Sequence, residues 1–147
     1  MEIIAGGPKA KVPGWGWFLA PTVLNNVTNP MDLAQNELFG PVLSVIRFSD
    51  EDEAIAIAIA NDSPFGLAAG VWTHNVNVAH RVAKRLDAGT VWINMYRALH
   101  FATPFGGSKL SGYGRENGMD GFAEVTKPKA IWIESSDEAV GEPFVLR

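Results

Sequence analysis

The chain has 147 residues, of which 47% are hydrophobic and 19% charged, with a formal net charge of −4. This balance is typical of a globular protein, and the length suits one domain of ordinary size. The acidic net charge argues against a nucleic-acid-binding surface, and no apolar run approaches the roughly 18 to 20 residues that span a bilayer. The first residues lack the basic and apolar regions of a signal peptide, so we expect a cytoplasmic protein.

The sequence contains no cysteine. Disulfides, thiolate metal ligands and thiol nucleophiles are therefore excluded within these residues. His74, His80 and His100 lack metal-ligand spacing, and no Gly-x-Ser-x-Gly nucleophile elbow occurs. The sequence thus offers no candidate catalytic residue and no candidate metal ligand.

The N-terminal part predicts irregular structure followed by one strand. Residues 5–17 are rich in Gly, Pro and Lys and predict a loop, whereas 18–24 predict a short extended segment and 25–31 a turn. Residues 42–48, VLSVIRF, are β-branched and aromatic and predict the first regular strand.

A helix is predicted over residues 54–60, with Asp50 as its N-cap. Ala and Ile alternate there, which would also fit a strand. Because both residue types are apolar, however, the alternation does not distinguish a buried face from an exposed one. On a helix, Ile55 and Ile59 share one face, while Ile57 lies roughly opposite and needs a second partner.

The next segments repeat the strand–helix order. Residues 67–73 and 90–95 predict strands, and Asn75 predicts the N-cap of a helix between them, with Gly89 as its stop signal. Apolar residues keep helical spacing along this helix, at Val76, Ala79, Val82, Ala83 and Leu86.

The order β-α-β-α-β with short connections predicts an α/β fold: a mainly parallel, partial doubly wound sheet with three parallel strands. Residues 96–121 then form a Gly-rich loop, and 130–134 predict a later strand outside that series. Residues 135–147 are acidic and aperiodic and predict a loose tail.

Three ordered segments carry a family resemblance. Residues 37–41 (ELFGP), 89–94 (GTVWIN) and 104–116 (PFGGSKLSGYGRE) resemble motifs of the aldehyde dehydrogenase family, in that family's order. Weaker matches lie at 5–7, 21–24 and 61–70, and the resemblance runs from about residue 5 to residue 134. It implies that residues 1–134 are the C-terminal part of an aldehyde dehydrogenase catalytic domain.

The resemblance implies a cofactor site. In the family a Cys thiolate attacks the aldehyde, a hydride passes to NAD or NADP, and a Glu base helps to hydrolyse the thioester. Glu37 matches the carboxylate that binds the nicotinamide-side ribose, and Phe39 matches the aromatic residue that packs near the nicotinamide. The alternative is that Glu37 is a solvated turn residue and Phe39 an anchor in the core.

The resemblance also implies a substrate channel along residues 96–105, with Leu99 and Phe105 facing the acyl chain. Both residues suit an aliphatic or aromatic aldehyde. Because Arg97 and His100 lie in the same segment, an acidic substrate is not excluded. Packing within the loop is the alternative role for Leu99 and Phe105. Two further matches are expected to be structural. Asn94 would bind loop backbone at a strand end, and Arg115 and Glu116 would form a salt bridge that holds the loop.

Residues 124–134 resemble the family's strand that pairs with a neighbouring subunit, which implies a homo-oligomer. Without a thiol nucleophile the chain is expected to be inactive alone and to bind no cofactor tightly. Its expected partner is a complementary N-terminal portion that carries the dinucleotide-binding domain and the catalytic Cys, with an aldehyde as the substrate of the complete enzyme. The alternative is a non-catalytic assembly module or a degenerate remnant.

Overall fold

The computed structural model describes residues 1–8, 11, 14, 16–49, 53–135, 137 and 141. Its elements in chain order are β1 (Glu2–Ala5), β2 (Thr22–Asn25), α1 (Asp32–Gln35), β3 (Val42–Ser44), α2 (Glu53–Asn61), β4 (Phe65–Gly66), β5 (Ala68–Val71), α3 (Val76–Arg85), β6 (Thr90–Ile93), β7 (Ser108–Lys109) and α4 (Gly118–Glu124). The chain is therefore a small α/β unit with mixed sheets. None of the helices in the described ranges is long and apolar enough to cross a membrane.

The N-terminal elements form one three-stranded sheet in the order β1-β2-β3. β1 runs antiparallel to β2, and β2 runs parallel to β3 with Thr22 opposite Val42. The buried hydroxyl of Thr22 accepts a hydrogen bond from the Gly7 amide at 2.9 Å and donates one to Ala20 O at 2.8 Å. This hydroxyl fixes the loop between β1 and β2 against the sheet.

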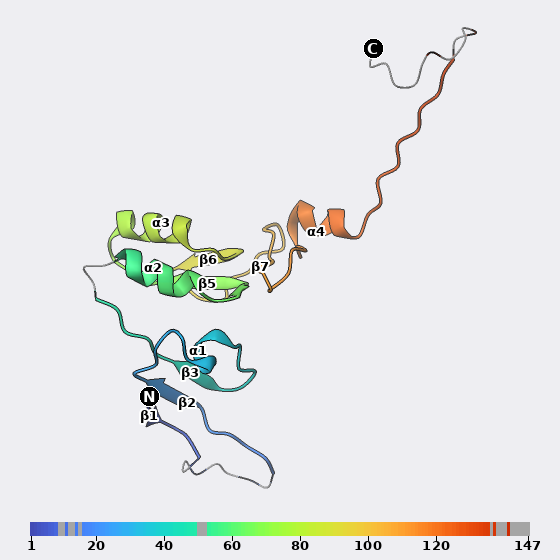
Figure 1. Cartoon of the computed structure of the whole chain (residues 1–147). Coiled ribbons are helices and arrows are strands. Elements are labelled where there is room, and N and C mark those ends of the chain that lie inside the picture. Colours follow the sequence, from blue (N-terminus) through green and yellow to red (C-terminus); the bar gives the residue numbers. More distant parts are fainter. Residues whose placement is uncertain are drawn as a thin grey trace.

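The C-terminal elements contain a parallel strand pair joined by a helix. β5 and β6 pair from Ala68 opposite Thr90 to Val71 opposite Ile93, and α3 is the crossover between them. The predicted cap is confirmed, because the Asn75 side chain accepts hydrogen bonds from the amides of Asn77 and Val78. Figure 1 shows α2 and α3 beside this pair, with α2 nearer to the N-terminal sheet than α3.

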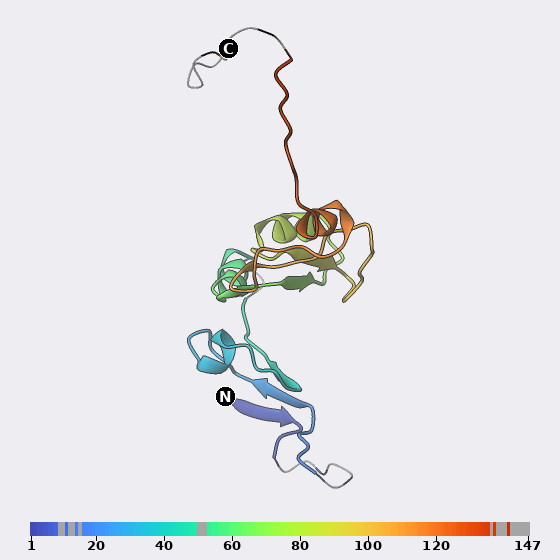
Figure 2. The same cartoon turned by 90° about the vertical axis from the view of Figure 1, so that its right-hand side faces the viewer.

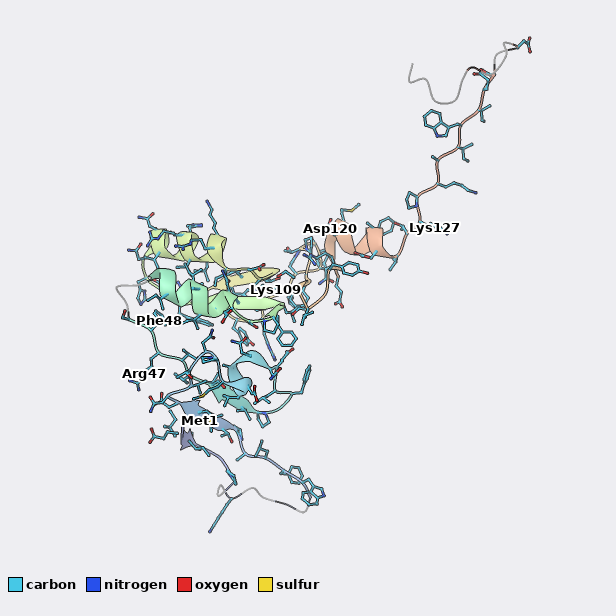
Figure 3. The ribbon with its side chains drawn as sticks, viewed as in Figure 1. Met1, Arg47, Phe48, Lys109, Asp120 and Lys127 are labelled. Atoms are coloured by element: carbon cyan, nitrogen blue, oxygen red, sulfur yellow. The ribbon has the colours of Figure 1, made fainter. Side chains whose placement is uncertain are left out.

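The predicted three-strand parallel core is not formed. The strand expected over 42–48 is shorter, Val42–Ser44, and pairs with β2 instead of β5. Backbone bonds from Val45 N to Leu24 O and from Val27 N to Val45 O continue the contact with β2. Because β2 satisfies that edge, the chain then leaves the sheet through Arg47 and Phe48, which lie on the connection to α2 (Figure 3).

The helix predicted over 54–60 is present as α2, Glu53–Asn61, while its predicted cap Asp50 lies outside the described residues. Its buried face is the one that carries Ile57, which was expected to need a partner of its own. Ile57 is 5% exposed, whereas Ile55 is 49% exposed. Ile57 faces α3, with Phe48 and Val82 lining the same hollow between the two helices.

Gly89 was expected to stop α3, but the helix already ends at Arg85, with Leu86 as its C-cap in an extended conformation. Gly89 serves a different purpose. A Cβ on this residue would lie 1.7 Å from the Gly106 carbonyl oxygen, so the Gly-rich loop passes directly over it. Only glycine permits this close approach.

Residues 130–134 were expected to be a strand, but the structure assigns no strand to them. Ile131, Trp132 and Ile133 are 76%, 93% and 83% exposed. Both views show the segment after α4 leaving the body of the chain (Figures 1 and 2). A strand forms only against a partner edge, and no strand of the described part of the chain pairs with Ile131–Ile133. Most of the predicted tail over 135–147 lies outside the described residues.

We predict that Gly89→Ala destabilises the fold by about 1–3 kcal/mol, because the added methyl group overlaps the Gly106 backbone. Gly40→Ala is the matched control, since nothing lies within 4 Å of its added Cβ. Thermal unfolding of both variants beside the parent chain measures the difference. Equal unfolding midpoints for the two variants would contradict the close approach of the Gly106 backbone to Gly89.

Candidate functional site

The first predicted site residue, Glu37, lines a cavity of about 330 Å³ that we call the α1–α2 cavity. Glu37 follows α1, and the opposite wall is formed by the end of α2 and by Leu67 beside β5. Phe39 is not part of this wall. Phe39 is 96% exposed, so it is not an anchor in the core that the described residues form.

The two predicted substrate residues lie together. Leu99 and Phe105 line one cavity of about 160 Å³, here called the loop cavity, with His100, Thr103 and Pro104. Leu99 is 59% exposed, so it does not serve as a buried packing residue in this chain. The loop 96–105 therefore wraps around a small hollow.

A third hollow shares wall residues with both predicted sites. This bridging cavity of about 390 Å³ shares Leu67 and Ser111 with the α1–α2 cavity and Phe105 with the loop cavity. Sequence reasoning did not single out Leu67 or Ser111. Both lie inside segments that carry the family resemblance, but no residue type or spacing marks either as a site residue.

Backbone hydrogen bonds and one arginine hold the Gly-rich loop beside this bridging cavity. Phe105 and Glu116 exchange two backbone hydrogen bonds of 2.7 Å each. Arg115 Nη1 donates to the carbonyl oxygens of Gly107, Tyr113 and Gly114 at 2.8, 3.1 and 2.9 Å. The loop lock expected from an Arg115–Glu116 salt bridge is therefore made by Arg115 and backbone carbonyls instead.

The structural role expected of Asn94 is present in the structure. Its side-chain oxygen accepts from the Thr73 amide at 2.9 Å, and its side-chain nitrogen donates to the Thr73 carbonyl at 2.9 Å. The amide group thus continues the β5–β6 pairing by one more residue beyond the strand ends. The left-handed backbone of Asn94, with φ of 53°, turns the chain into the loop that lines the loop cavity.

Lys109 joins the Gly-rich loop to the ends of two helices. Its ammonium group donates to the carbonyl oxygens of Asn61 and Ser63 at 2.6 and 3.0 Å and lies 3.4 Å from an Asp87 carboxylate oxygen. Asn61 in turn accepts a hydrogen bond from the Asp87 amide at 2.8 Å. Figure 3 shows Lys109 between the α2–β5 region and α4, and its partners Asn61, Ser63 and Asp87 line the α1–α2 cavity.

We predict that Lys109→Met speeds hydrogen exchange at the Leu110 and Gly66 amides by about tenfold, because a charged clamp on the loop is lost. Lys129→Met is the control, since Lys129 is exposed on the extended segment after α4. Mass spectrometry of exchanged peptides reports both sites. Unchanged exchange in the Lys109 variant would show that the clamp does not hold the loop.

Known proteins resemble this chain over nearly its full length. Residues 1–131 match the model of the aldehyde dehydrogenase family. A betaine aldehyde dehydrogenase of Brucella anthropi is 47% identical over 134 residues, which are 90% of this chain and 27% of that protein. This chain therefore spans about a quarter of the length of such relatives.

Solved structures agree with this sequence match. The indole-3-acetaldehyde dehydrogenase of P. syringae, in complex with NAD+ and IAA, is 44% identical with a TM-score of 0.82, covering 90% of this chain and 26% of that one. The NAD+ complex of a Bacillus cereus aldehyde dehydrogenase is 45% identical with a TM-score of 0.81, covering 92% of this chain and 27% of that one. Sequence motifs, family model and fold all agree, and the chain belongs to the aldehyde dehydrogenase family.

Proposed function

We propose that this chain supplies part of the nicotinamide and substrate pocket of an NAD(P)-dependent aldehyde dehydrogenase, which converts an aldehyde to a carboxylic acid. The observation that carries the proposal is a set of three neighbouring cavities that share wall residues. Glu37 lies at one end, Leu99 and Phe105 lie at the other, and Leu67 belongs to the wall between them. A cofactor and an aldehyde must meet in one space for a hydride to pass.

The residues at the Glu37 end fit a nicotinamide cofactor. A carboxylate offers two acceptor oxygens, which suit the two hydroxyl groups of a ribose. Phe39 presents an almost fully exposed ring, which is free to pack beside a planar group. We assign Glu37 to the ribose and Phe39 to the nicotinamide; the bound cofactor would accept the hydride. Solved relatives contain NAD+, which supports this assignment.

At the other end, Leu99 and Phe105 would hold the acyl part of the aldehyde. Their apolar side chains gain free energy when an acyl chain displaces water from the loop cavity. Neither side chain can attack a carbonyl. The role of this end is to bind and orient the aldehyde, so that its reactive carbon is presented toward the bridging cavity.

The nucleophile must come from residues outside these 147, which contain no cysteine. We propose a complementary N-terminal portion that carries the thiolate and the dinucleotide-binding domain. In that assembly residues 1–134 belong to the catalytic domain and join a doubly wound sheet, and residues 124–134 pair with a neighbouring subunit in a homo-oligomer. The unpaired segment at Ile131–Ile133, with all three side chains exposed, supports the last assignment.

A second candidate is a non-catalytic assembly module. The same exposed apolar segment and unpaired strand edges favour it, because such surfaces associate with other chains. The two functions differ in one respect. An assembly module makes no use of Glu37, whereas the enzyme portion requires its carboxylate for cofactor binding.

We predict that the chain alone reduces no NAD+ in the presence of an aldehyde, because it lacks a thiolate. Co-expression with the portion of the Bacillus cereus aldehyde dehydrogenase that lies before the region similar to this chain should give NADH formation, followed by its absorbance. A second N-terminal portion with its nucleophilic Cys replaced by Ala is the control and should give none. Turnover by the chain alone, free of contaminating enzyme, would refute the proposal.

Glu37→Gln in the assembled enzyme is predicted to raise the KM for NAD+ by about ten- to hundredfold, since charge-assisted hydrogen bonds to the ribose are weakened. Glu2→Gln is the matched control, because Glu2 lies exposed on β1, outside the described cavities. Steady-state kinetics with varied NAD+ separates the two variants. Equal KM values would favour the assembly module.

A further inference from the structure

The segment of residues 95–99, which leads into the loop cavity, makes few contacts that could fix its position. Met95, Tyr96 and Leu99 are all exposed, so burial does not hold the segment in place. Among the described residues, the only hydrogen bond that the segment makes runs from the Trp92 indole N–H to the Ala98 carbonyl oxygen, at 2.8 Å. The position of residues 95–99 therefore depends largely on Trp92.

Trp92 is itself fixed by the strand pair. It is a buried residue of β6 and lies opposite Gly70 of β5, and the ring of Tyr96 packs edge-on against it with ring centroids 5.5 Å apart. Thr90, two residues earlier on β6, lines the loop cavity. Side chains two residues apart on a strand point to the same face of the sheet. The indole group thus belongs to the face of β6 that forms part of the cavity wall.

The hydrogen bond to Ala98 also orients Leu99. The carbonyl group of Ala98 and the amide of Leu99 belong to one planar peptide group, so a donor that fixes the carbonyl oxygen restricts the whole plane. Both residues line the loop cavity. The indole N–H therefore sets the point from which the Leu99 side chain extends.

The other end of the loop is held without Trp92. The carbonyl oxygen of Phe101 accepts a hydrogen bond from the Gly118 amide at 2.8 Å, and Phe105 exchanges two backbone hydrogen bonds with Glu116. Of the two proposed acyl contacts, Phe105 is thus fixed by its own backbone. Leu99 has no such bond among the described residues and relies on the carbonyl group before it.

We propose that Trp92 is a positioning residue for the aldehyde, because its indole N–H holds the Ala98 carbonyl group and thereby places Leu99 against the acyl chain. The inference rests on the proposed function, in which Leu99 contacts that chain. Trp92 does not line the loop cavity and acts through Ala98 and Leu99. Each further methylene group of an acyl chain adds apolar contact, so correct placement of Leu99 favours long aldehydes over short ones.

The test uses the enzyme assembled from this chain and the Bacillus cereus portion, with hexanal as a long aldehyde and acetaldehyde as a short one. Trp92→Phe should raise the KM for hexanal about tenfold, which corresponds to the loss of contact with about one methylene group. The kcat for hexanal, both constants for acetaldehyde and the KM for NAD+ should stay nearly unchanged. Equal losses with both aldehydes would show a purely structural role and overturn the inference.

Two further variants separate the hydrogen bond from packing. Trp17→Phe is the matched control, because it removes an indole group from a fully exposed residue of the β1–β2 loop and should change no kinetic constant. Benzothienylalanine at position 92 keeps both fused rings and replaces the N–H group by sulfur. It should reproduce the rise in KM for hexanal, and a KM equal to that of the parent enzyme would overturn the inference.

A double-mutant cycle tests whether Trp92 acts through Leu99. Leu99→Ala should itself lower the ratio of kcat/KM for hexanal to that for acetaldehyde. In the Leu99→Ala background, Trp92→Phe should then lower this ratio by less than about twofold, since the contact that it positions is already lost. Fully additive losses would show that Trp92 acts by another route, and would overturn the inference.

The hydrogen bond can also be measured in the chain alone, independently of turnover. The NMR shift of the Ala98 carbonyl carbon should differ between the parent chain and the benzothienylalanine variant, and should stay the same in Trp17→Phe. An unchanged shift in the benzothienylalanine variant would mean that no such bond is made, and would overturn the inference. Failure of the parent assembly to oxidise either aldehyde would instead contradict the proposed function.

Discussion

The structure depends on one constraint: the chain folds around too little buried apolar surface to close an interior of its own. Its accessible surface is 12245 Å², whereas a compact monomer of this mass exposes about 7,400 Å². Among the described residues the buried apolar side chains are Leu24, Val27, Ile57, Ala79 and Trp92, and large side chains such as Phe39 and Trp132 are almost fully exposed. This excess surface agrees with a chain that spans about a quarter of the length of its relatives.

With so small a core, specific polar contacts have to fix the loops that line the cavities. Lys109 binds the ends of α2 and α3, Asn94 extends the β5–β6 pairing, and Arg115 gathers three carbonyl groups of the Gly-rich loop. Each contact holds backbone in place, so the loops keep their shape where few apolar contacts support them. Trp92 is the exception, since it combines burial with a hydrogen bond to Ala98 and thereby joins the core to the cavity wall.

Local sequence patterns predicted the elements whose structure is decided locally. The cap at Asn75, the helices α2 and α3 and the strands β5 and β6 follow from side-chain type and spacing within a few residues. The pairing of β3 could not be predicted in this way, because strand order depends on contacts between segments that are distant in the sequence. β3 pairs with β2 and does not join the predicted sheet with β5. Gly89 is required because the backbone of Gly106, seventeen positions further along the chain, passes close to it. No local sequence pattern indicates this contact. The site residues came from the family resemblance; the cavities place Leu99 and Phe105 side by side, and they add Leu67, which no pattern had marked.

Differential hydrogen exchange of the chain, alone and assembled with the N-terminal portion, tests this account most directly. If the exposed surface is half of a shared interior, amides in residues 42–44 and 131–133 should exchange about a hundredfold more slowly after assembly, because new partners cover both segments. The capped start of α3, at Asn77 and Val78, should change little, since its hydrogen bonds are already complete within the chain. Unchanged exchange in both segments of an assembly that turns over aldehyde would show that this surface is not an interior, and would contradict the account.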